Sequence, residues 1–245
     1  MTRYRMKLEY DGTAFVGWQR QDNGTGVQEA LENALLAFTG EEAAVYGAGR
    51  TDAGVHALAQ VAHFDLEKYF TANKVREAMN AHVRPHPVAI LEVDEVTEDF
   101  HARFSAVDRS YEYRILNRRA PAAIGLDRCW HVPVALDTGA MHDAAQVLLG
   151  EHDFTSFRAT VCQAKSPVRT LSEISVSRDG DAVITRVRAR SFLHNQVRII
   201  MGALRKVGEG RWTKQDMVDV LAACDRTHTG QTAPPQGLYL SDVRY

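Results

Sequence analysis

The sequence predicts an α+β fold made of two successive α/β halves. Segments in which apolar and polar residues alternate, as in strands, are interspersed with segments whose apolar residues recur every three or four positions, as in helices. This series of strands and helices occurs twice along the 245 residues, with a division near residue 105. We therefore expect an N-terminal α/β domain over residues 1–105 and a C-terminal α/β domain over residues 106–245.

The first half contains one helix with clear end signals, expected over residues 25–40. Thr25 and Gln28 have the spacing of a capping box, and Gly40 follows the last turn. The apolar residues of this segment fall on one helix face and are Val27, Leu31, Ala34, Leu35 and Phe38. The other elements expected in this half are strands over residues 5–11, 59–64 and 88–93 and a helix over residues 72–80.

The second half repeats this alternation of strands and helices. Asp137 has the position of an N-cap for a helix that ends at Leu149, before Gly150. An Asp-Gly pair predicts the turn of a hairpin over residues 171–190. The other elements expected are strands over residues 110–117 and 237–243 and helices over residues 194–208 and 214–222.

Composition indicates a globular protein of the cytoplasm. Apolar residues make up 45% of the chain and charged residues 24%, both ordinary values. The N-terminal segment lacks the apolar stretch of a signal peptide, and no apolar run approaches the roughly 18 residues that span a membrane.

The cysteines and histidines do not have the spacing of a metal site. Cys129, Cys162 and Cys224 are far apart, which argues against a disulfide framework and against a thiolate zinc site. The ten histidines include no H-E-x-x-H motif.

Positive charge is concentrated in two segments, although the formal net charge is −2. Residues 184–214 contain eight arginines and lysines and a single acidic residue, and residues 101–119 contain five arginines. Residues 92–99 contain five acidic residues. The basic segments are expected to form either a solvated face or a surface that binds a polyanion.

A glycine-rich segment, GAGRTDAGVHA at residues 47–57, contains a single acidic residue, Asp52. It has the glycine spacing of a P-loop, but Val55 and His56 replace the lysine and the hydroxyl residue that hold nucleotide and magnesium. A dinucleotide fingerprint fails because Asp52 occupies its third glycine position. We therefore expect a pliable loop that another backbone or a ligand approaches closely.

Asp52 has two interpretations. Its carboxylate could accept a hydrogen bond from its own backbone in an Asx turn, or it could act as a nucleophile or base. His194, Arg198 and Arg205 form a polar stripe on a later helix, where Gly202 leaves room for close approach. A cation there would keep Asp52 ionised by lowering its pKa, unless the stripe is simply a solvated helix face.

Two strands offer side chains suited to binding nucleic acid. Arg186, Arg188 and Arg190 alternate with apolar residues and share one face, where like charges repel unless an anion lies across them. Tyr111 and Tyr113 also share a face and could stack on a base, although either tyrosine could equally belong to the core.

Seven segments, in the same order, resemble the TruA family of tRNA pseudouridine synthases. The resemblance extends over nearly the whole chain, and the block RTDAGVHA is highly specific. The segments are YDGTAFVGWQRQ (10–21), GAGRTDAGVHALAQVAHF (47–64), DFHARFSA (99–106), RSYEYRI (109–115), GEHDFTSF (150–157), FLHNQVRIIMGAL (192–204) and GLYLSDVRY (237–245).

This resemblance implies an enzyme that isomerises uridine to pseudouridine at positions 38, 39 and 40 in the anticodon stem-loop of tRNA. It implies no cofactor and no metal. It also implies two ferredoxin-like α/β halves that form a continuous, mainly antiparallel sheet, flanked by helices around a basic cleft, in a protein that acts as a homodimer.

The resemblance also assigns roles to individual residues. Asp52 corresponds to the essential aspartate, Tyr111 to the tyrosine that contacts the target uridine, and Arg198 to the basic partner of the aspartate. Arg50 would help to admit the flipped nucleotide. The further residues expected to contact RNA are Arg186, Arg188, Arg190, His194 and Arg205. The chain departs from many bacterial members at Asn195 and Gln196, where those members have His and Met.

The chemistry of the reaction agrees with these motifs. Pseudouridine and uridine contain the same atoms, so the reaction requires no redox or phosphate step. Asp52 could attack C1′ or remove a ribose proton, and the sequence leaves both routes open. The target must be flipped out of a stacked helix, and Tyr111 would offset part of the cost of unstacking.

Two other classes of function compete with the isomerase. An RNA-binding module or tRNA-folding chaperone would use the same basic surface without chemistry. A hydrolase would use Asp52 on another glycosidic bond, but carboxylate glycosidases need a second acidic group across that bond, and none lies near this segment.

Overall fold

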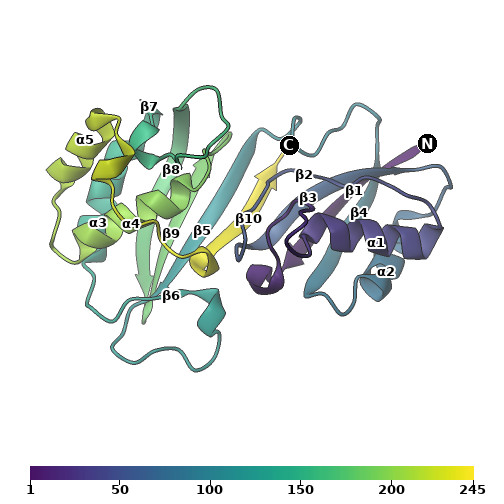
Figure 1. Ribbon diagram of the computed structural model, residues 1–245, viewed down its shortest axis with the longest axis horizontal. Coiled ribbons are helices and arrows are strands. Elements are labelled where there is room, and N and C mark those ends of the chain that lie inside the picture. Colours follow the sequence, from purple (N-terminus) through teal and green to yellow (C-terminus); the bar gives the residue numbers. More distant parts are fainter. The chain divides into compact units, whose positions relative to one another are not determined.

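The computed structural model describes the whole chain, residues 1–245, as an α+β fold with five α-helices and ten strands (Figure 1). The strand pairs are mainly antiparallel. The predicted fold class is therefore confirmed. None of the helices has the length and apolar character needed to cross a lipid bilayer.

The chain forms two compact units. The first consists of Met1–Arg109 together with Tyr239–Tyr245, and the second of Ser110–Leu238. The end of the chain thus belongs to the first unit, whereas the sequence suggested one C-terminal domain up to residue 245. The physical reason is that β10 (Leu238–Arg244) pairs in parallel with β3 (His56–Leu66) of the first unit.

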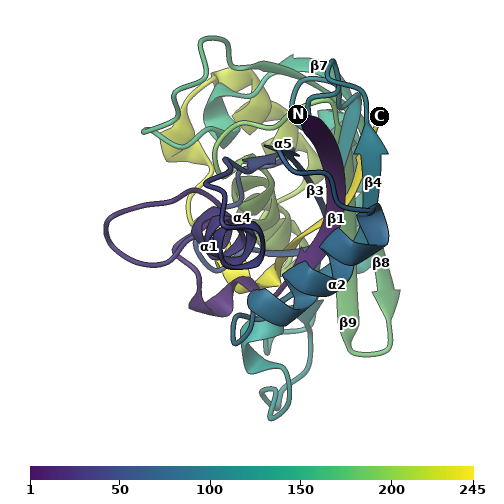
Figure 2. The same cartoon turned by 90° about the vertical axis from the view of Figure 1, so that its right-hand side faces the viewer.

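The first unit is a sheet with two packed helices. Its remaining elements are β1 (Thr2–Tyr10), α1 (Val27–Thr39), β2 (Tyr46–Gly47), α2 (Ala72–His82) and β4 (Val88–Val96). The strand order is β4-β1-β3-β10, with β2 also paired to β3. Helix α2 packs against β4 and α1 (Figure 2).

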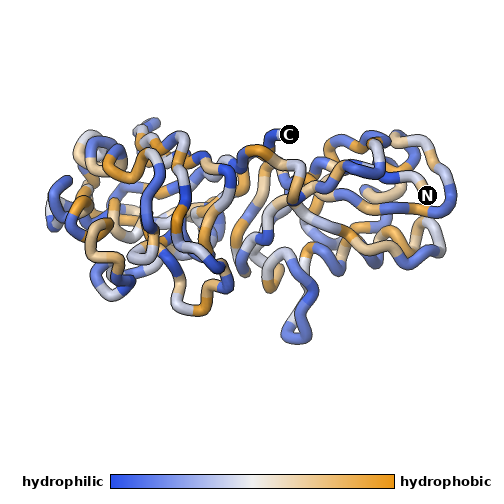
Figure 3. The backbone as a smooth tube through the Cα atoms, turned by 90° about the horizontal axis from the view of Figure 1, so that it is seen from above, coloured by the Kyte–Doolittle hydropathy of each residue, from blue (hydrophilic) through white to orange (hydrophobic).

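Strand β1 shows why this segment folds as a strand. Tyr4, Met6 and Leu8 are fully buried, whereas the residues between them are partly exposed. This period of two places every second side chain in the core. Phe64 of β3 stacks on Tyr4, with ring centroids 5.6 Å apart. Figure 3 shows hydrophilic and hydrophobic residues interspersed along the backbone.

The second unit contains a sheet and three helices. Its elements are β5 (Asp108–Leu116), β6 (Trp130–His131), α3 (Thr138–Ala145), β7 (Gly150–Asp153), β8 (Val168–Asp179), β9 (Ala182–Ala189), α4 (Gln196–Gly208) and α5 (Lys214–Ala223). The strand order is β5-β9-β8-β7, with β6 paired in parallel to β5. Helix α3 packs against β8, α4 and α5. The predicted hairpin is confirmed, with β8 and β9 antiparallel and Gly180 in its turn at φ 54°.

Helix caps were predicted with mixed success. Asp137 caps α3 as expected, since its Oδ1 accepts the N–H of Ala140 at 2.9 Å. The capping box of Thr25 in α1 is wrong, because the N-cap is Gly26 and no side chain caps the helix. The first two helical N–H groups instead donate to the carbonyl oxygens of Gly17 and Trp18, at 3.1 and 2.9 Å.

Candidate active site

The glycine-rich loop connects β2 to β3 and carries Asp52. Its backbone pairs with the segment before α1, because the N–H of Trp18 donates to the Thr51 carbonyl at 2.9 Å and Gly17 forms an isolated bridge with Asp52. The N–H of Gly54 donates to the carbonyl of Phe15 at 3.4 Å. The loop therefore lies on a fixed backbone support.

Buried side chains also hold this loop. The amide of Gln60, fully buried in β3, accepts the N–H of Gly49 at 3.0 Å and donates to the Gly49 carbonyl at 2.8 Å. The hydroxyls of Tyr10 and Thr51 lie 2.7 Å apart in a buried hydrogen bond. These bonds fix the backbone on both sides of Arg50.

Arg109 supports the start of the loop. Its guanidinium is buried and donates from Nε and Nη2 to the carbonyl of Ala48, at 3.2 and 3.1 Å. Nη2 also donates to the carbonyl of Arg103 at 2.6 Å. Hydrogen bonds from a charged donor are stronger than those between neutral groups. Arg109 thus ties the loop to the turn that contains Arg103.

The glycines of the loop serve close packing more than pliability. Gly54 has a φ of 75°, which favours glycine. A Cβ on Gly47 would lie 2.4 Å from the ring of Trp18, so no larger residue fits there. The expectation that another backbone approaches closely is confirmed, but the loop is anchored and not pliable.

The side chain of Asp52 is partly exposed. An Asx turn would use the N–H of Gly54, which instead donates to Phe15. The turn is closed by the main chain, where the Asp52 carbonyl accepts the N–H of Val55 at 3.1 Å. Both interpretations of Asp52, an Asx turn and a catalytic carboxylate, stay predictions. Arg50, two residues earlier, is exposed.

Arg198 lies on the first turn of α4 and is held in one orientation. Its Nε donates to the carbonyl of Ala233 and its Nη1 to Oδ1 of Asn195, both at 2.8 Å. Asn195 is the N-cap of α4 and has a φ of 61°, a conformation that asparagine tolerates. Gly202 permits the close approach of the neighbouring segment, since a Cβ there would lie 1.9 Å from the carbonyl oxygen of Gln231.

Asn195 and Gln196, where the chain departs from many members of the family it resembles, both form hydrogen bonds within the second unit. Asn195 contacts Arg198 directly. Gln196 is buried and its Oε1 accepts the N–H of Leu193 at 2.8 Å, while its Nε2 has no hydrogen-bond partner.

The other members of the polar stripe differ from Arg198. Arg205 pairs with Glu209 at 2.6 Å and lies over the ring of Trp130, 5.0 Å from its centroid. The charge of Arg205 is therefore compensated by Glu209 within the second unit. His194 is exposed, and its carbonyl accepts the N–H of Ala159 at 3.1 Å.

The prediction that Tyr111 and Tyr113 together form a surface for stacking a base is wrong. Tyr113 is fully buried and donates to the carbonyl of Pro234 at 2.8 Å, and burial raises the pKa of its hydroxyl well above the usual value. Tyr111 is only half-buried, with its ring edge-on to Phe192 at 5.1 Å. Only Tyr111 therefore stays a candidate for contact with a substrate.

The arginines of β9 have anionic partners within the protein. Arg186 pairs with Glu112 at 3.1 Å and Arg188 with Glu173 at 3.0 Å. The anion expected across these arginines is thus supplied, for two of them, by carboxylates of the same unit. Arg190 follows β9 and is exposed.

No group of three or more His, Cys, Asp or Glu side chains could hold a metal ion. Cys129, Cys162 and Cys224 are free thiols.

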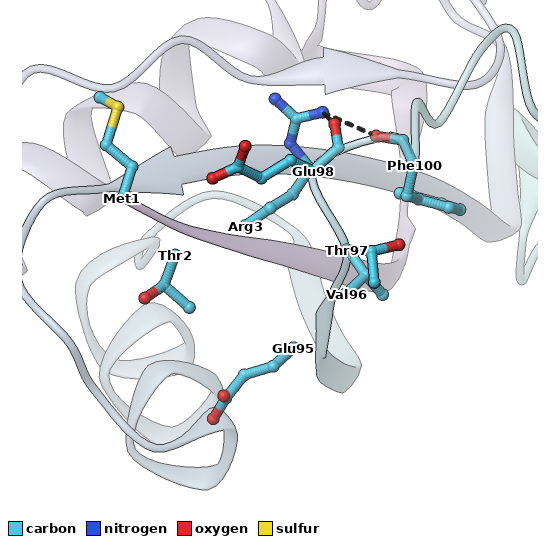
Figure 4. A pocket seen from close by; sticks show the side chains of 8 residues that line it. All are labelled: Met1, Thr2, Arg3, Glu95, Val96, Thr97, Glu98 and Phe100. Atoms are coloured by element: carbon cyan, nitrogen blue, oxygen red, sulfur yellow. Dashed lines mark hydrogen bonds between the residues drawn. The ribbon is translucent and has the colours of Figure 1, made fainter.

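A surface hollow in the first unit contains none of the predicted site residues (Figure 4). Its main cation, Arg3, is bound to Asp65 through Nε and Nη2, each at 2.8 Å, and donates to the carbonyls of Glu98 and Phe100. Its charge is therefore compensated, and the hydrogen bond to Asp65 raises its pKa. The residues lining the hollow are Met1, Thr2, Arg3, Glu95, Val96, Thr97, Glu98 and Phe100.

The predicted site residues thus fall in both units. Arg50 and Asp52 share the anchored loop of the first unit, while Tyr111 and Arg198 belong to the second. Pairing of Asp52 with Arg198 stays a prediction. Gln60, Arg109 and the role of Asn195 were not predicted from the sequence. The available signal was a polar residue, Gln60, placed between the apolar residues Ala59 and Val61.

Comparison with known proteins identifies the family. A family model described as tRNA pseudouridine synthase matches residues 7–105 and 144–245. The chain is 60% identical to the tRNA pseudouridine synthase A of Rhodospirillum centenum, 59% to that of Afipia carboxidovorans and 57% to that of Parvibaculum lavamentivorans, in each case over the whole of both chains. The chain therefore belongs to the tRNA pseudouridine synthase family and is an isomerase.

Proposed function

We propose that this protein converts uridine to pseudouridine at positions 38, 39 and 40 in the anticodon stem-loop of tRNA, with Asp52 as the catalytic group. The chain is 60% and 59% identical, over its full length, to two proteins named tRNA pseudouridine synthase A, and this similarity supports the reaction and the substrate. The observation that carries the role of Asp52 is its partly exposed carboxylate on a loop anchored by Gln60 and Arg109.

The reaction breaks one bond at C1′ of the ribose and forms another. The bond from N1 of the base to C1′ breaks, the base turns, and C5 bonds to C1′. The proton on C5 leaves to solvent, and N1 gains a proton. Asp52 serves either as the nucleophile that attacks C1′ or as the base that removes a ribose proton.

The other site residues assist this step. Arg198, oriented by Asn195 and Ala233, is the proposed basic partner of Asp52. Tyr111 contacts the flipped uridine, for which a half-buried ring edge-on to another aromatic is suited. Arg50 admits the nucleotide from its exposed position.

The proposal extends to the setting of the enzyme. The protein acts in the cytoplasm as a homodimer. Exposed cationic residues, among them Arg50, Arg190 and His194 when protonated, contact the tRNA. Light scattering of the purified protein tests the dimer, and a monomer at micromolar concentration contradicts it.

Tritium release from unmodified tRNA labelled at C5 of uridine tests the reaction. The wild-type protein alone, without added cofactor, should release tritium, whereas Asp52→Asn should release none and still bind tRNA. Asp22→Asn changes an exposed acid outside the loop and is the matched control. Full activity of Asp52→Asn contradicts the proposal, and free uracil among the products indicates a hydrolase.

A further inference from the structure

An exposed aromatic cluster lies beside the glycine-rich loop, in the first unit. Phe104 is 75% exposed and Tyr46 50% exposed, unusual values for aromatic residues of such size. The ring of His101 lies between them, 4.3 Å from Phe104 and 5.8 Å from Tyr46, measured between centroids. The three rings form one continuous surface.

Two arginines without carboxylate partners border this surface. Arg103 lies over the ring of Phe104, with its guanidinium carbon 5.9 Å from the centroid. Partial burial, and then the positive charges of Arg50 and Arg109, lower the pKa of Arg103. Arg109 donates to the carbonyls of both Ala48 and Arg103, so the segment of Arg50 is tied to the turn of Arg103, and both arginines are exposed. We call the surface of Tyr46, His101, Phe104, Arg50 and Arg103 the aromatic–arginine face.

The turn that presents Phe104 is fixed. Nδ1 of His101 accepts the N–H groups of Arg103 and Phe104, at 3.1 and 3.3 Å. The carbonyl of Ala102 accepts the Tyr245 hydroxyl at 2.6 Å, and Arg109 holds the carbonyl of Arg103. An exposed ring on a fixed turn is prepared for a partner, because little conformational freedom is lost on binding.

We infer that the aromatic–arginine face binds an unpaired nucleotide of the substrate RNA, with the base stacked on Phe104 and the phosphate held by Arg103 and Arg50. Flat rings beside uncompensated guanidinium groups match the base and the phosphate of single-stranded RNA. A second copy of this chain, docked on this face about a two-fold axis, would bring like charges together. This inference rests on the proposed function, and it adds to Arg50 four residues that have no role assigned in the reaction.

Binding of an unmodified tRNA transcript, measured by fluorescence anisotropy, tests this inference. Phe104→Ala should weaken binding about 5- to 150-fold, the range that stacking on one aromatic ring provides. Phe104→Leu should be equally weak, whereas Phe104→Trp should bind as the wild type does, because only tryptophan keeps an aromatic face. Arg103→Gln should weaken binding and reduce its dependence on salt concentration.

Tyr69→Ala is the matched control. Tyr69 is also an exposed aromatic residue of the first unit, at 62%, but its hydroxyl donates to Glu95 in an acidic surrounding. This variant should bind tRNA as the wild type does. Thermal unfolding of each variant establishes that it is folded.

Three results would overturn the inference. Wild-type affinity of Phe104→Ala excludes stacking, and wild-type affinity of Phe104→Leu reduces the role of Phe104 to apolar contact. Sedimentation that shows Phe104→Ala to dissociate a dimer, with unchanged tRNA affinity per protomer, assigns the face to a second copy of the chain. Failure of the proposed function is distinct, because the wild-type protein then releases no tritium whatever the Phe104 variants bind.

Discussion

The side-chain amide of Gln60 pairs with the main chain of Gly49 through two hydrogen bonds, of 3.0 and 2.8 Å, as one strand pairs with the next. Gly49 lies three residues before Asp52. The position of the Asp52 carboxylate thus depends on a polar residue buried in β3 and not on the loop alone.

Replacing Gln60 should destabilise the first unit and reduce activity. Gln60→Leu leaves a buried N–H and a buried carbonyl of Gly49 unpaired, at about 1–3 kcal/mol for each group. We expect the free energy of unfolding in urea to fall by about 2–6 kcal/mol. Tritium release should fall below that of the wild type at temperatures where the variant is folded. An unchanged unfolding midpoint contradicts this account of the loop.

Gly47→Ala should be destabilising through overpacking. The new methyl group would lie 2.4 Å from the ring of Trp18, and strain of this kind costs about 1–3 kcal/mol. In a Trp18→Leu background the same substitution should cost less, because the obstructing ring is absent. Thermal unfolding of the two single variants and the double variant measures this coupling, and additive losses of stability exclude it.

Asn195 is expected to act as a positioning residue for Arg198. Asn195→Gly retains the positive φ but removes the acceptor of the Arg198 hydrogen bond, so kcat should fall about tenfold while KM for tRNA changes little. Asn195→Asp retains an acceptor oxygen and should restore most of the activity. A parallel rise in KM without loss of kcat, or no rescue by aspartate, would exclude this role.

Arg205 is expected to contribute more to stability than to RNA binding. Glu209, whose side chain is 7% exposed, accepts a hydrogen bond from Arg205, so Arg205→Gln leaves a nearly buried carboxylate without its closest cation. Thermal unfolding should shift to lower temperature, while the affinity of the folded protein for tRNA stays close to that of the wild type. A selective loss of tRNA affinity would instead support the RNA contact that the resemblance implies.

Local sequence signals predicted most helices and strands. The long-range hydrogen bonds that hold the glycine-rich loop could not be predicted from the sequence. The cap at Asp137 and the turn at Gly180 depend on residues within a few positions, so the sequence contains their full explanation. The bond from Arg109 to Ala48 joins residues 61 positions apart, and no periodicity encodes such a pair. The expected cap at Thr25 is wrong for a similar reason. The carbonyl oxygens of Gly17 and Trp18, which lie outside the capping motif, accept the first two N–H groups of α1.

The last prediction concerns stability at acidic pH. Burial, and then the nearby charges of His101 and Arg3, lower the pKa of His63 from 6.5 to about 4 in the folded protein. Between these two values the unfolded chain takes up a proton at His63 that the folded protein does not, so the free energy of unfolding should decrease as pH falls from 6.5 to about 4. Below that range both states are protonated at this position, and His63 contributes no further change. In His63→Asn, whose Oδ1 can still accept the N–H of Ala102, the decrease should be smaller when urea unfolding is compared at pH 7 and pH 4.5. Equal pH dependence of the two proteins would show that His63 does not titrate in this way.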